Sequence, residues 1–199
     1  MEVRPCAMRA CEVMAVVAAV IALAGSVPYV IDTLSGHTRP NRATWMVYAV
    51  VGCLAVVSSY AAGGRWSLLL GVAYAIGPIA ILLASIRHGE GGWSPLDRSC
   101  LGLAAFGLVG WAVSGDPRVG VVLQTLADAV GTVPTWIKAW RDPAHENRRA
   151  WTCYAAASVL NLFAIASWSI GEVCYNAWLV LCCGSVAAIL WIRPHHRLR

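Results

Sequence analysis

The stretch "GTVPTWIKAWRDPAHENRRAW", residues 131–151, places a proline inside an apolar segment that ends in a cluster of charges. The stretch "GSVPYVIDTLSGHTRPNRATW", residues 25–45, has the same order of features 106 residues earlier. A shift of 106 residues aligns, without a gap, Gly25 with Gly131, Pro28 with Pro134, Asn41 with Asn147, Arg42 with Arg148, Trp45 with Trp151, and Tyr48 with Tyr154. Random apolar sequence would not align such residue types by chance, so the chain is predicted to contain a duplicated unit.

The composition of the chain is that of a membrane protein. Hydrophobic residues make up 59% of its 199 residues and charged residues 13%, whereas a soluble domain carries about 25% charged residues. Seven apolar segments stand out, at 12–34, 44–62, 66–86, 98–114, 119–139, 150–170 and 173–192. Most of them approach the ~20 residues that a helix needs to cross a bilayer. We therefore expect an all-α membrane protein with seven transmembrane helices.

The fourth segment determines how the two copies are oriented. Three crossings leave the chain on the opposite side of the membrane, so a second copy that followed directly would be inverted. One extra crossing restores the orientation, and two parallel three-helix repeats result, as in one class of transporters. The expected order is 3+1+3, with a first triple-helix repeat at 1–97, a linker helix at 98–116, and a second repeat with a short cytoplasmic tail at 117–199.

The basic residues predict which side of the membrane each loop faces. If the N-terminus lies outside, eleven of the fifteen Lys and Arg residues fall on the side of the C-terminus. Basic residues accumulate on the cytoplasmic side, so we expect the N-terminus outside and the C-terminus in the cytoplasm. Residues 1–26 could instead form a cleaved signal peptide, because they combine a basic start with an apolar run. The duplication argues against cleavage, since this segment is the partner of the fifth one.

Cysteine spacing and charge argue against a metal centre and a nucleic-acid partner. None of the eight cysteines forms a CxxC pair, and most lie in apolar segments, where they behave as small hydrophobic residues. The nearest candidate for metal ligation is the pair His195 and His196 in the tail. The net charge of +5 sits at helix ends and in loops, which is typical of a topology signal. We expect no metal, no other cofactor and no nucleic acid.

Pro28 and Pro134 occupy equivalent positions near the end of the first helix of each repeat. A proline removes one backbone hydrogen bond and kinks or loosens a helix. The two prolines could form static kinks, or they could be hinges that let one end of each helix swing. A symmetric pair favours hinges.

A 3+1+3 chain with a proline near the end of its first and fifth helices resembles the PQ-loop and SWEET superfamily of membrane proteins. That superfamily includes sugar-transporting SWEETs, lysosomal amino-acid exporters, nicotinamide riboside transporters and the KDEL receptor. Tyr29 and Thr135 stand where the PQ-loop name requires glutamine, so amino-acid specificity is not carried over. The stretch "LADAVGTVPTWIKAWRDPAHE", from residue 126, looks more like uncharacterised bacterial membrane proteins of the same general fold. The resemblance therefore implies a bacterial plasma membrane.

Asp128 is the most prominent ionisable residue at membrane depth, where such residues are functional candidates by default. Gln124 lies four residues earlier and therefore on the same helix face. If that face lines a central cavity, Asp128 could bind a cationic substrate or carry a proton. Alternatively, it could bond to neighbouring backbone or hydroxyl groups and lock the kinked helix.

Other polar candidates for substrate binding are Tyr74, Asn161 and Asn176. SWEET proteins use asparagine and tryptophan around the sugar, and Asn161 is expected near the membrane centre, Asn176 nearer the outer surface. Trp168 and Trp178 could form a pocket wall, but tryptophans near helix ends more often anchor the helix at the membrane interface.

Asp32 and Lys138 occupy equivalent positions near the predicted cytoplasmic ends of their helices. They could pair between the repeats as an inner gate, or each could extend toward the lipid headgroups. The loop "RDPAHENRR", residues 141–149, is expected to be a solvated connector in which Glu146 pairs weakly with a neighbouring arginine.

Three functions remain open from the sequence. The first is transport of a small polar metabolite across the lipid bilayer by alternating access, with proton coupling through Asp128 as an option. The second is an integral membrane enzyme that uses Asp128 as an acid on a lipidic substrate, although no second acid and no nucleophile–base pair converge with it. The third is a ligand-sensing receptor or scaffold. Any of them is compatible with a homo-oligomer, and fold alone does not decide between them.

Overall fold

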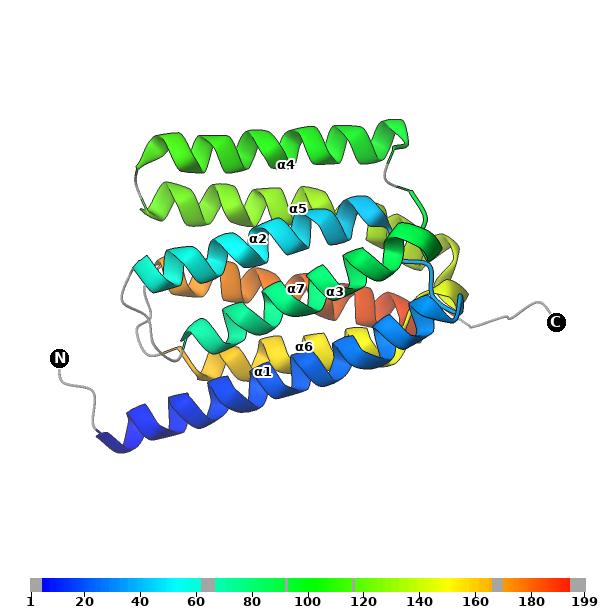
Figure 1. The fold of residues 1–199 in the computed structure, drawn as a ribbon. Coiled ribbons are helices and arrows are strands. Elements are labelled where there is room, and N and C mark those ends of the chain that lie inside the picture. Colours follow the sequence, from blue (N-terminus) through cyan, green and yellow to red (C-terminus); the bar gives the residue numbers. More distant parts are fainter. Residues whose placement is uncertain (1–4, 62–66, 92, 116, 166–169, 194–199) are drawn as a thin grey trace.

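The computed structural model describes residues 5–61, 67–91, 93–115, 117–165 and 170–193 (Figure 1). These residues form α1 (Pro5–Leu34), α2 (Arg42–Ala61), α3 (Ser67–His88), α4 (Pro95–Ser114), α5 (Pro117–Arg141), the 3₁₀ turn η1 (Pro143–His145), α6 (Arg148–Phe163) and α7 (Ile170–Ile192). The described chain is all-helical, with no β-strand. The predicted apolar segments correspond to α1 to α7. The largest differences are at α1, which begins earlier than predicted, and at α6, which ends at residue 163 rather than 170.

Local sequence accounts for several helix ends. Ser94 caps α4 in a capping box with Asp97, and Gly115 ends the same helix in the left-handed conformation at φ 63°. Gly36, at φ 77°, follows the end of α1 in the same left-handed region. Asn147 caps α6 by accepting a 2.8 Å hydrogen bond from the amide of Ala150.

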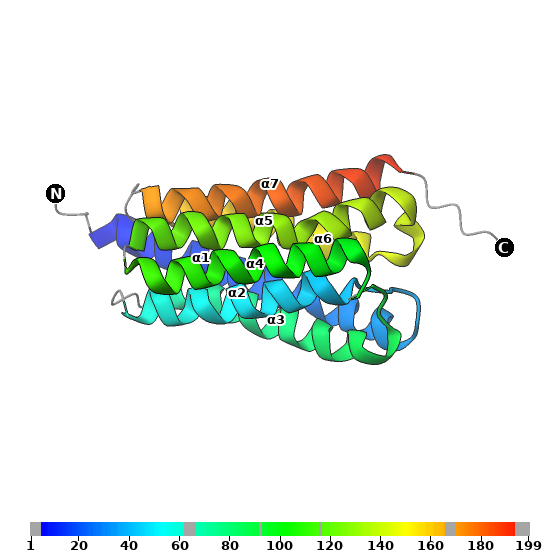
Figure 2. The same ribbon diagram turned by 90° about the horizontal axis from the view of Figure 1, so that it is seen from above.

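The helices lie side by side along one direction (Figures 1 and 2). α3 packs against both α1 and α2, and α7 packs against both α5 and α6. Between these two groups, α1 contacts α6 and α2 contacts α5, while α4 packs on α5 and α2. The α1–α2, α3–α4 and α5–α6 connections all lie at the end of the bundle where α7 finishes (Figure 1). We call this the connection end.

Within the described part of the chain, three helical stretches are long and apolar enough to cross a membrane, namely Arg9–Leu34, Gly71–His88 and Val173–Ile192. The outward-facing positions of the helices also carry large apolar side chains, among them Val20 at 59% exposure, Leu83 at 62%, Phe106 at 78% and Leu181 at 66%. Several charged side chains are buried instead, including those of Asp128, Lys138 and Glu146. A contiguous apolar exterior marks a surface that meets lipid or a partner. The chain is therefore a candidate membrane protein.

Candidate functional site

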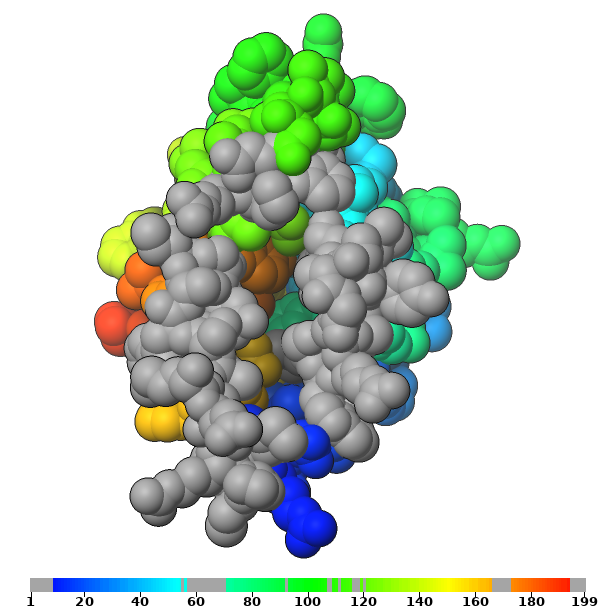
Figure 3. Space-filling model, turned by 90° about the vertical axis from the view of Figure 1, so that its left-hand side faces the viewer, coloured from blue at the N-terminus to red at the C-terminus, as the bar shows by residue number. Residues whose placement is uncertain are grey.

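A narrow cavity of about 40 Å³ lies inside the bundle, between the α1–α2–α3 group and the α5–α6–α7 group. That volume holds roughly three water molecules. Much of its wall is aromatic, formed by Trp45, Tyr48, Tyr74, Trp151, Tyr154 and Tyr175. Figure 3 views the end of the bundle opposite to the connection end, where atoms of α7 and α3 are visible in the middle of the molecule. The cavity is the candidate site because it brings together side chains from both groups.

Two glycines allow the helices around the cavity to approach closely. A Cβ on Gly25 of α1 would lie 2.7 Å from the Cβ of Cys153 on α6. A Cβ on Gly131 of α5 would lie 2.6 Å from Cγ1 of Val47 on α2. Contacts this short do not occur between real Cβ atoms, so only glycine fits at these positions. Both pairs are related by the same shift of 106 residues.

Two hydrogen bonds across the same interfaces obey that shift as well. The hydroxyls of Tyr48 on α2 and Thr132 on α5 are 2.8 Å apart, and those of Tyr154 on α6 and Ser26 on α1 are 2.9 Å apart. Thr132 also donates to the carbonyl of Asp128, as Ser26 does to the carbonyl of Ala22, four residues earlier in each case. These Ser and Thr hydroxyls lie two residues before Pro134 and Pro28, so each proline-containing helix is tied to the opposite group.

Asp128 lies in the cavity wall, and only 2% of its surface is exposed. Its Oδ2 atom accepts a 2.7 Å hydrogen bond from the indole N–H of Trp178 on α7. Among the described residues, no cationic side chain lies within 4 Å of its carboxyl group. A carboxyl group in this setting either holds a proton or receives a cation from a ligand, because an unpaired buried charge is costly.

The other predicted substrate-binding residues divide into two sets. Tyr74 lines the cavity, and its hydroxyl lies 2.8 Å from that of Ser158. Asn161 donates from its side-chain amide to the side-chain oxygen of Asn176, and neither lines the cavity. Gln124 is buried, as expected for the face that it shares with Asp128, but it lies outside the cavity lining. A side-chain amide carries both N–H donors and an acceptor oxygen, so two facing asparagines can pair directly.

Proline occurs inside three described helices, at Pro28 in α1, Pro78 in α3 and Pro134 in α5. Pro28 and Pro134 lie in equivalent turns, as predicted. Pro78 was not singled out from the sequence, because it has no counterpart at the 106-residue shift, yet it is the proline that lines the cavity.

A buried ionic cluster lies at the connection end. Lys138 and Glu146 form a 2.7 Å ion pair, with side chains 4% and 0% exposed. The other carboxylate oxygen of Glu146 accepts hydrogen bonds from the hydroxyl of Tyr29 at 2.7 Å and the indole N–H of Trp151 at 3.0 Å. Lys138 also donates to the carbonyls of Arg39 and His145. We call these residues the Glu146 cluster.

The Glu146 cluster corrects two predictions from the sequence. The pair between Asp32 and Lys138, one of the two alternatives for these residues, is absent from the described ion pairs, and Asp32 accepts a 2.6 Å hydrogen bond from the side-chain amide of Asn147 instead. The 141–149 loop was expected to be a solvated connector, yet Glu146 and Asn147 are buried. Glu146 is closer in sequence to Lys138 than Asp32 is, and the η1 turn folds it back over the end of α5.

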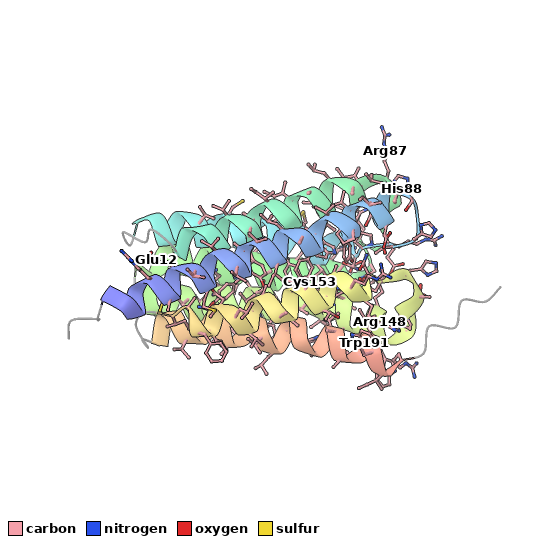
Figure 4. All side chains as sticks on the ribbon, turned by 90° about the horizontal axis from the view of Figure 1, so that it is seen from below. Glu12, Arg87, His88, Arg148, Cys153 and Trp191 are labelled. Atoms are coloured by element: carbon pink, nitrogen blue, oxygen red, sulfur yellow. The ribbon has the colours of Figure 1, made fainter. Side chains whose placement is uncertain are left out.

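The tryptophans only partly follow the interface-anchor prediction. Trp178 donates to Asp128, and Trp45 and Trp151 are buried with ring centroids 6.0 Å apart. Trp191, in contrast, is 61% exposed beneath the guanidinium of Arg148, 4.7 Å from its ring centroid (Figure 4). The side chain of Trp168 and the pair of His195 and His196 lie outside the described residues.

Beside the Glu146 cluster, Glu90 lies in the α3–α4 connection, 3.9 Å from the amine of Lys138. Burial raises the pKa of the Glu90 carboxyl, and the charge of Lys138 works against that rise. The backbone of this connection also ties two loops together, because Glu90 donates to the carbonyl of Pro40 and accepts from the amide of Arg42. Three connections therefore close this end of the bundle.

Together, the fold and the cavity define a helical bundle with a buried acidic, aromatic-lined site. Comparisons with protein-family models, with curated proteins and with solved structures find no match. Lys138 was a candidate from the sequence, but the burial of its partner Glu146 was missed, since nothing in "HENRR" distinguishes a buried glutamate from a solvated one. The alignment of Tyr48 with Tyr154 was the signal that could have identified these two cavity tyrosines.

Proposed function

We propose that the chain is a membrane transporter of a small metabolite that works by alternating access around the Asp128 cavity. In this proposal, α1–α3 and α5–α7 are two parallel copies of one unit, joined by α4, in the manner of the PQ-loop and SWEET superfamily. All seven helices cross the membrane, and the connection end faces the cytoplasm.

Reciprocal packing supports the two-unit architecture. α3 contacts both other helices of its group, and α7 does the same in the second group. The first helix of each group contacts the second helix of the other, so the α1–α6 and α2–α5 interfaces are equivalent. The paired glycine contacts and the paired tyrosine hydrogen bonds lie in these two interfaces. A site between two such units can be opened from either side by rocking one unit against the other.

The observation that carries the functional proposal is the position of Asp128, a carboxyl group with no cationic partner among the described residues, in a cavity that both units line. An ionisable group at membrane depth that faces a cavity typically marks a substrate or proton pathway. The aromatic wall and the small volume correspond to a closed conformation, which must widen to admit a metabolite. The Glu146 cluster is the barrier on the connection side, because it bridges α1, α5 and α6.

A thermal-shift screen of the purified protein, followed by uptake into proteoliposomes, tests this function. Sugars, amino acids, nucleosides, vitamins and polyamines are added at two pH values to the wild type, to Asp128→Asn and to Asp142→Asn. Asp142 is the matched control, because its carboxylate lies outside the cavity and pairs with His145. We expect a compound that stabilises the wild type and the control, enters proteoliposomes, and does neither with Asp128→Asn. Full activity of Asp128→Asn would show that Asp128 is structural.

The double variant Pro28→Ala with Pro134→Ala tests the hinges. If both prolines loosen α1 and α5 for rocking, the variant slows uptake at saturating substrate by about tenfold or more and changes the binding constant by less than about threefold. Pro78→Ala is the comparison variant, since Pro78 touches the cavity without a counterpart in the second unit. Equal losses of rate and affinity in the double variant would contradict the hinge role.

A further inference from the structure

Three of the four tyrosine hydroxyls around the cavity already form hydrogen bonds with protein atoms. The hydroxyls of Tyr48, Tyr74 and Tyr154 each lie within 2.9 Å of a Ser or Thr hydroxyl on another helix. Asn161 and Asn176 satisfy each other outside the cavity lining. A site selects a polyhydroxylated ligand through polar groups that pair with the ligand's hydroxyls. Few such groups are free here, so the cavity is poorly suited to a sugar.

The groups left for a ligand are mainly aromatic rings and one carboxyl group. Among the described residues of the lining, the hydroxyl of Tyr175 and the indole N–H of Trp45 are also without a hydrogen bond. Trp45, Trp151 and the cavity tyrosines contribute the rings, and Asp128 contributes the negative charge. Aromatic faces attract cations through their quadrupole, and a desolvated cation gains most from them. We propose that this cavity binds a small monovalent organic cation, an amine or a quaternary ammonium ion that has no carboxylate of its own. This inference rests on the proposed transport function and names its substrate class.

The cavity disfavours a cationic ligand that also carries an acidic group. No Lys, Arg or His is among the described residues that line it. Lys138, a buried cation at the connection end, is already held by Glu146. The carboxylate of an amino acid or another zwitterion would therefore enter the cavity without a partner and lose its hydration. Cations are thus preferred to zwitterions as well as to neutral compounds.

The size of the cavity adds a conformational requirement. About 40 Å³ admits a few waters but not a choline-sized ion, so binding has to widen the space between the two units. The carboxyl group of Asp128 accepts a hydrogen bond from Trp178 on α7. The backbone carbonyl of Asp128 accepts one from Thr132, which lies in the α2–α5 interface. A cation that reaches the carboxyl group therefore contacts elements of both units, which couples its binding to their relative movement.

The test uses two series of compounds with nearly constant shape and changing charge. The first is choline, glycine betaine and 3,3-dimethylbutan-1-ol, and the second is n-butylamine, 4-aminobutyrate and 1-pentanol. Binding is measured by thermal shift and calorimetry on the full chain, and transport by uptake into proteoliposomes. The wild type, Asp128→Asn and the control Asp142→Asn are compared, and circular dichroism checks that each variant is folded.

We expect at least one of the two cations to bind the wild type at least about tenfold more tightly than its zwitterion and its neutral analogue. Asp128→Asn should lose that preference, and Asp142→Asn should keep it. The inference would be overturned by equal binding of glycine betaine, by binding of the alcohols alone, or by no binding of either cation. It would also be overturned if a folded Asp128→Asn bound the cations as the wild type does. Uptake of a neutral compound would leave transport standing without the cation site. Cation binding without uptake would leave the site standing without transport.

Discussion

Two buried carboxyl groups of this chain have opposite surroundings. Glu146 is paired with Lys138 and accepts from Tyr29 and Trp151, so both of its oxygens are occupied. Asp128 accepts from a single indole N–H and lines a cavity. Both residues are almost fully buried, with relative exposures of 4% and 2% for the whole residue.

The comparison shows that burial alone does not reveal the role of an acid. A buried carboxylate whose oxygens both have hydrogen-bond or ion-pair partners stabilises the local packing. Removing it leaves those partners without hydrogen bonds. An acid with an incomplete set has capacity left for a proton or a ligand. On this basis we assign Glu146 a structural role at the connection end and propose a ligand-binding or proton-binding role for Asp128 in the cavity. The following variants test that division of roles.

The largest effect is expected at the connection end. Glu146→Gln leaves the buried Lys138 charge with only Glu90, 3.9 Å away and partly exposed, as a counter-ion, which should destabilise the protein by about 3 kcal/mol and lower Tm by roughly 10 °C. Lys138→Met combined with Glu146→Gln should recover much of that loss, because no unpaired charge remains. Thermal unfolding of the three proteins in one detergent measures both. A double variant as unstable as the sum of its parts would contradict the ion-pair explanation.

An intermediate effect is expected from packing beside the cavity. Gly25→Ala and Gly131→Ala place a Cβ within 2.7 Å of Cys153 and within 2.6 Å of Val47, and each should cost about 1–3 kcal/mol. Gly102→Ala is the control, since nothing lies within 4 Å of its Cβ position. Unfolding in a denaturant series compares the three. Similar losses for the first two would support the equivalence of the α1–α6 and α2–α5 interfaces, and a stable Gly131→Ala would argue against it.

A small effect on stability, in contrast to Glu146, is expected at Asp128. Asp128→Asn keeps an oxygen that can accept from Trp178 and removes an acid without a cationic partner. Its unfolding free energy should therefore lie within about 1 kcal/mol of the wild type, or above it, while ligand binding is lost. A drop of the size expected for Glu146→Gln would mean that Asp128 is a structural acid as well, and the contrast between the two sites would disappear.

The smallest effect concerns pH at Glu90. Its pKa is raised in the folded protein from the ordinary value of 4.5, so the folded state holds this proton more tightly than the unfolded state. The resulting stabilisation is complete below pH 4.5 and is lost as pH rises through the folded pKa. Glu90→Gln should match the wild type near pH 4 and exceed its Tm by about 1–2 °C at pH 7. Parallel Tm curves of the two proteins from pH 4 to 7 would rule out this assignment.

The positions of the helices could be predicted from the sequence, but the hydrogen-bond and ion-pair partners of the buried polar residues could not. The apolar segments predicted α1 to α7, and the isolated Asp128 was identified as a buried acid because any charge within such a segment is conspicuous. Its partner Trp178 is 50 residues away, and no periodicity links the two. Asp32 and Lys138 are equivalent by the shift, and pairing between them was one of two alternatives, the other being that each extends toward the lipid headgroups. Equivalence by a shift does not predict contact, and the η1 turn places Glu146 on Lys138 instead.

The sequence by itself determined the helical class, the apolar exterior and the recurrence of one sequence motif at a distance of 106 residues. These properties follow from composition and from the spacing of residues along the chain, so they can be predicted without knowing which helices contact each other. Only the tertiary structure decided which polar groups are satisfied. It brought Tyr29 and Trp151 to Glu146, engaged the tyrosine hydroxyls across helices, and left Asp128 with one neutral donor. Hydrogen bonds and ion pairs depend on distances of about 3 Å between helices, and these distances are set by close packing around residues such as Gly25 and Gly131.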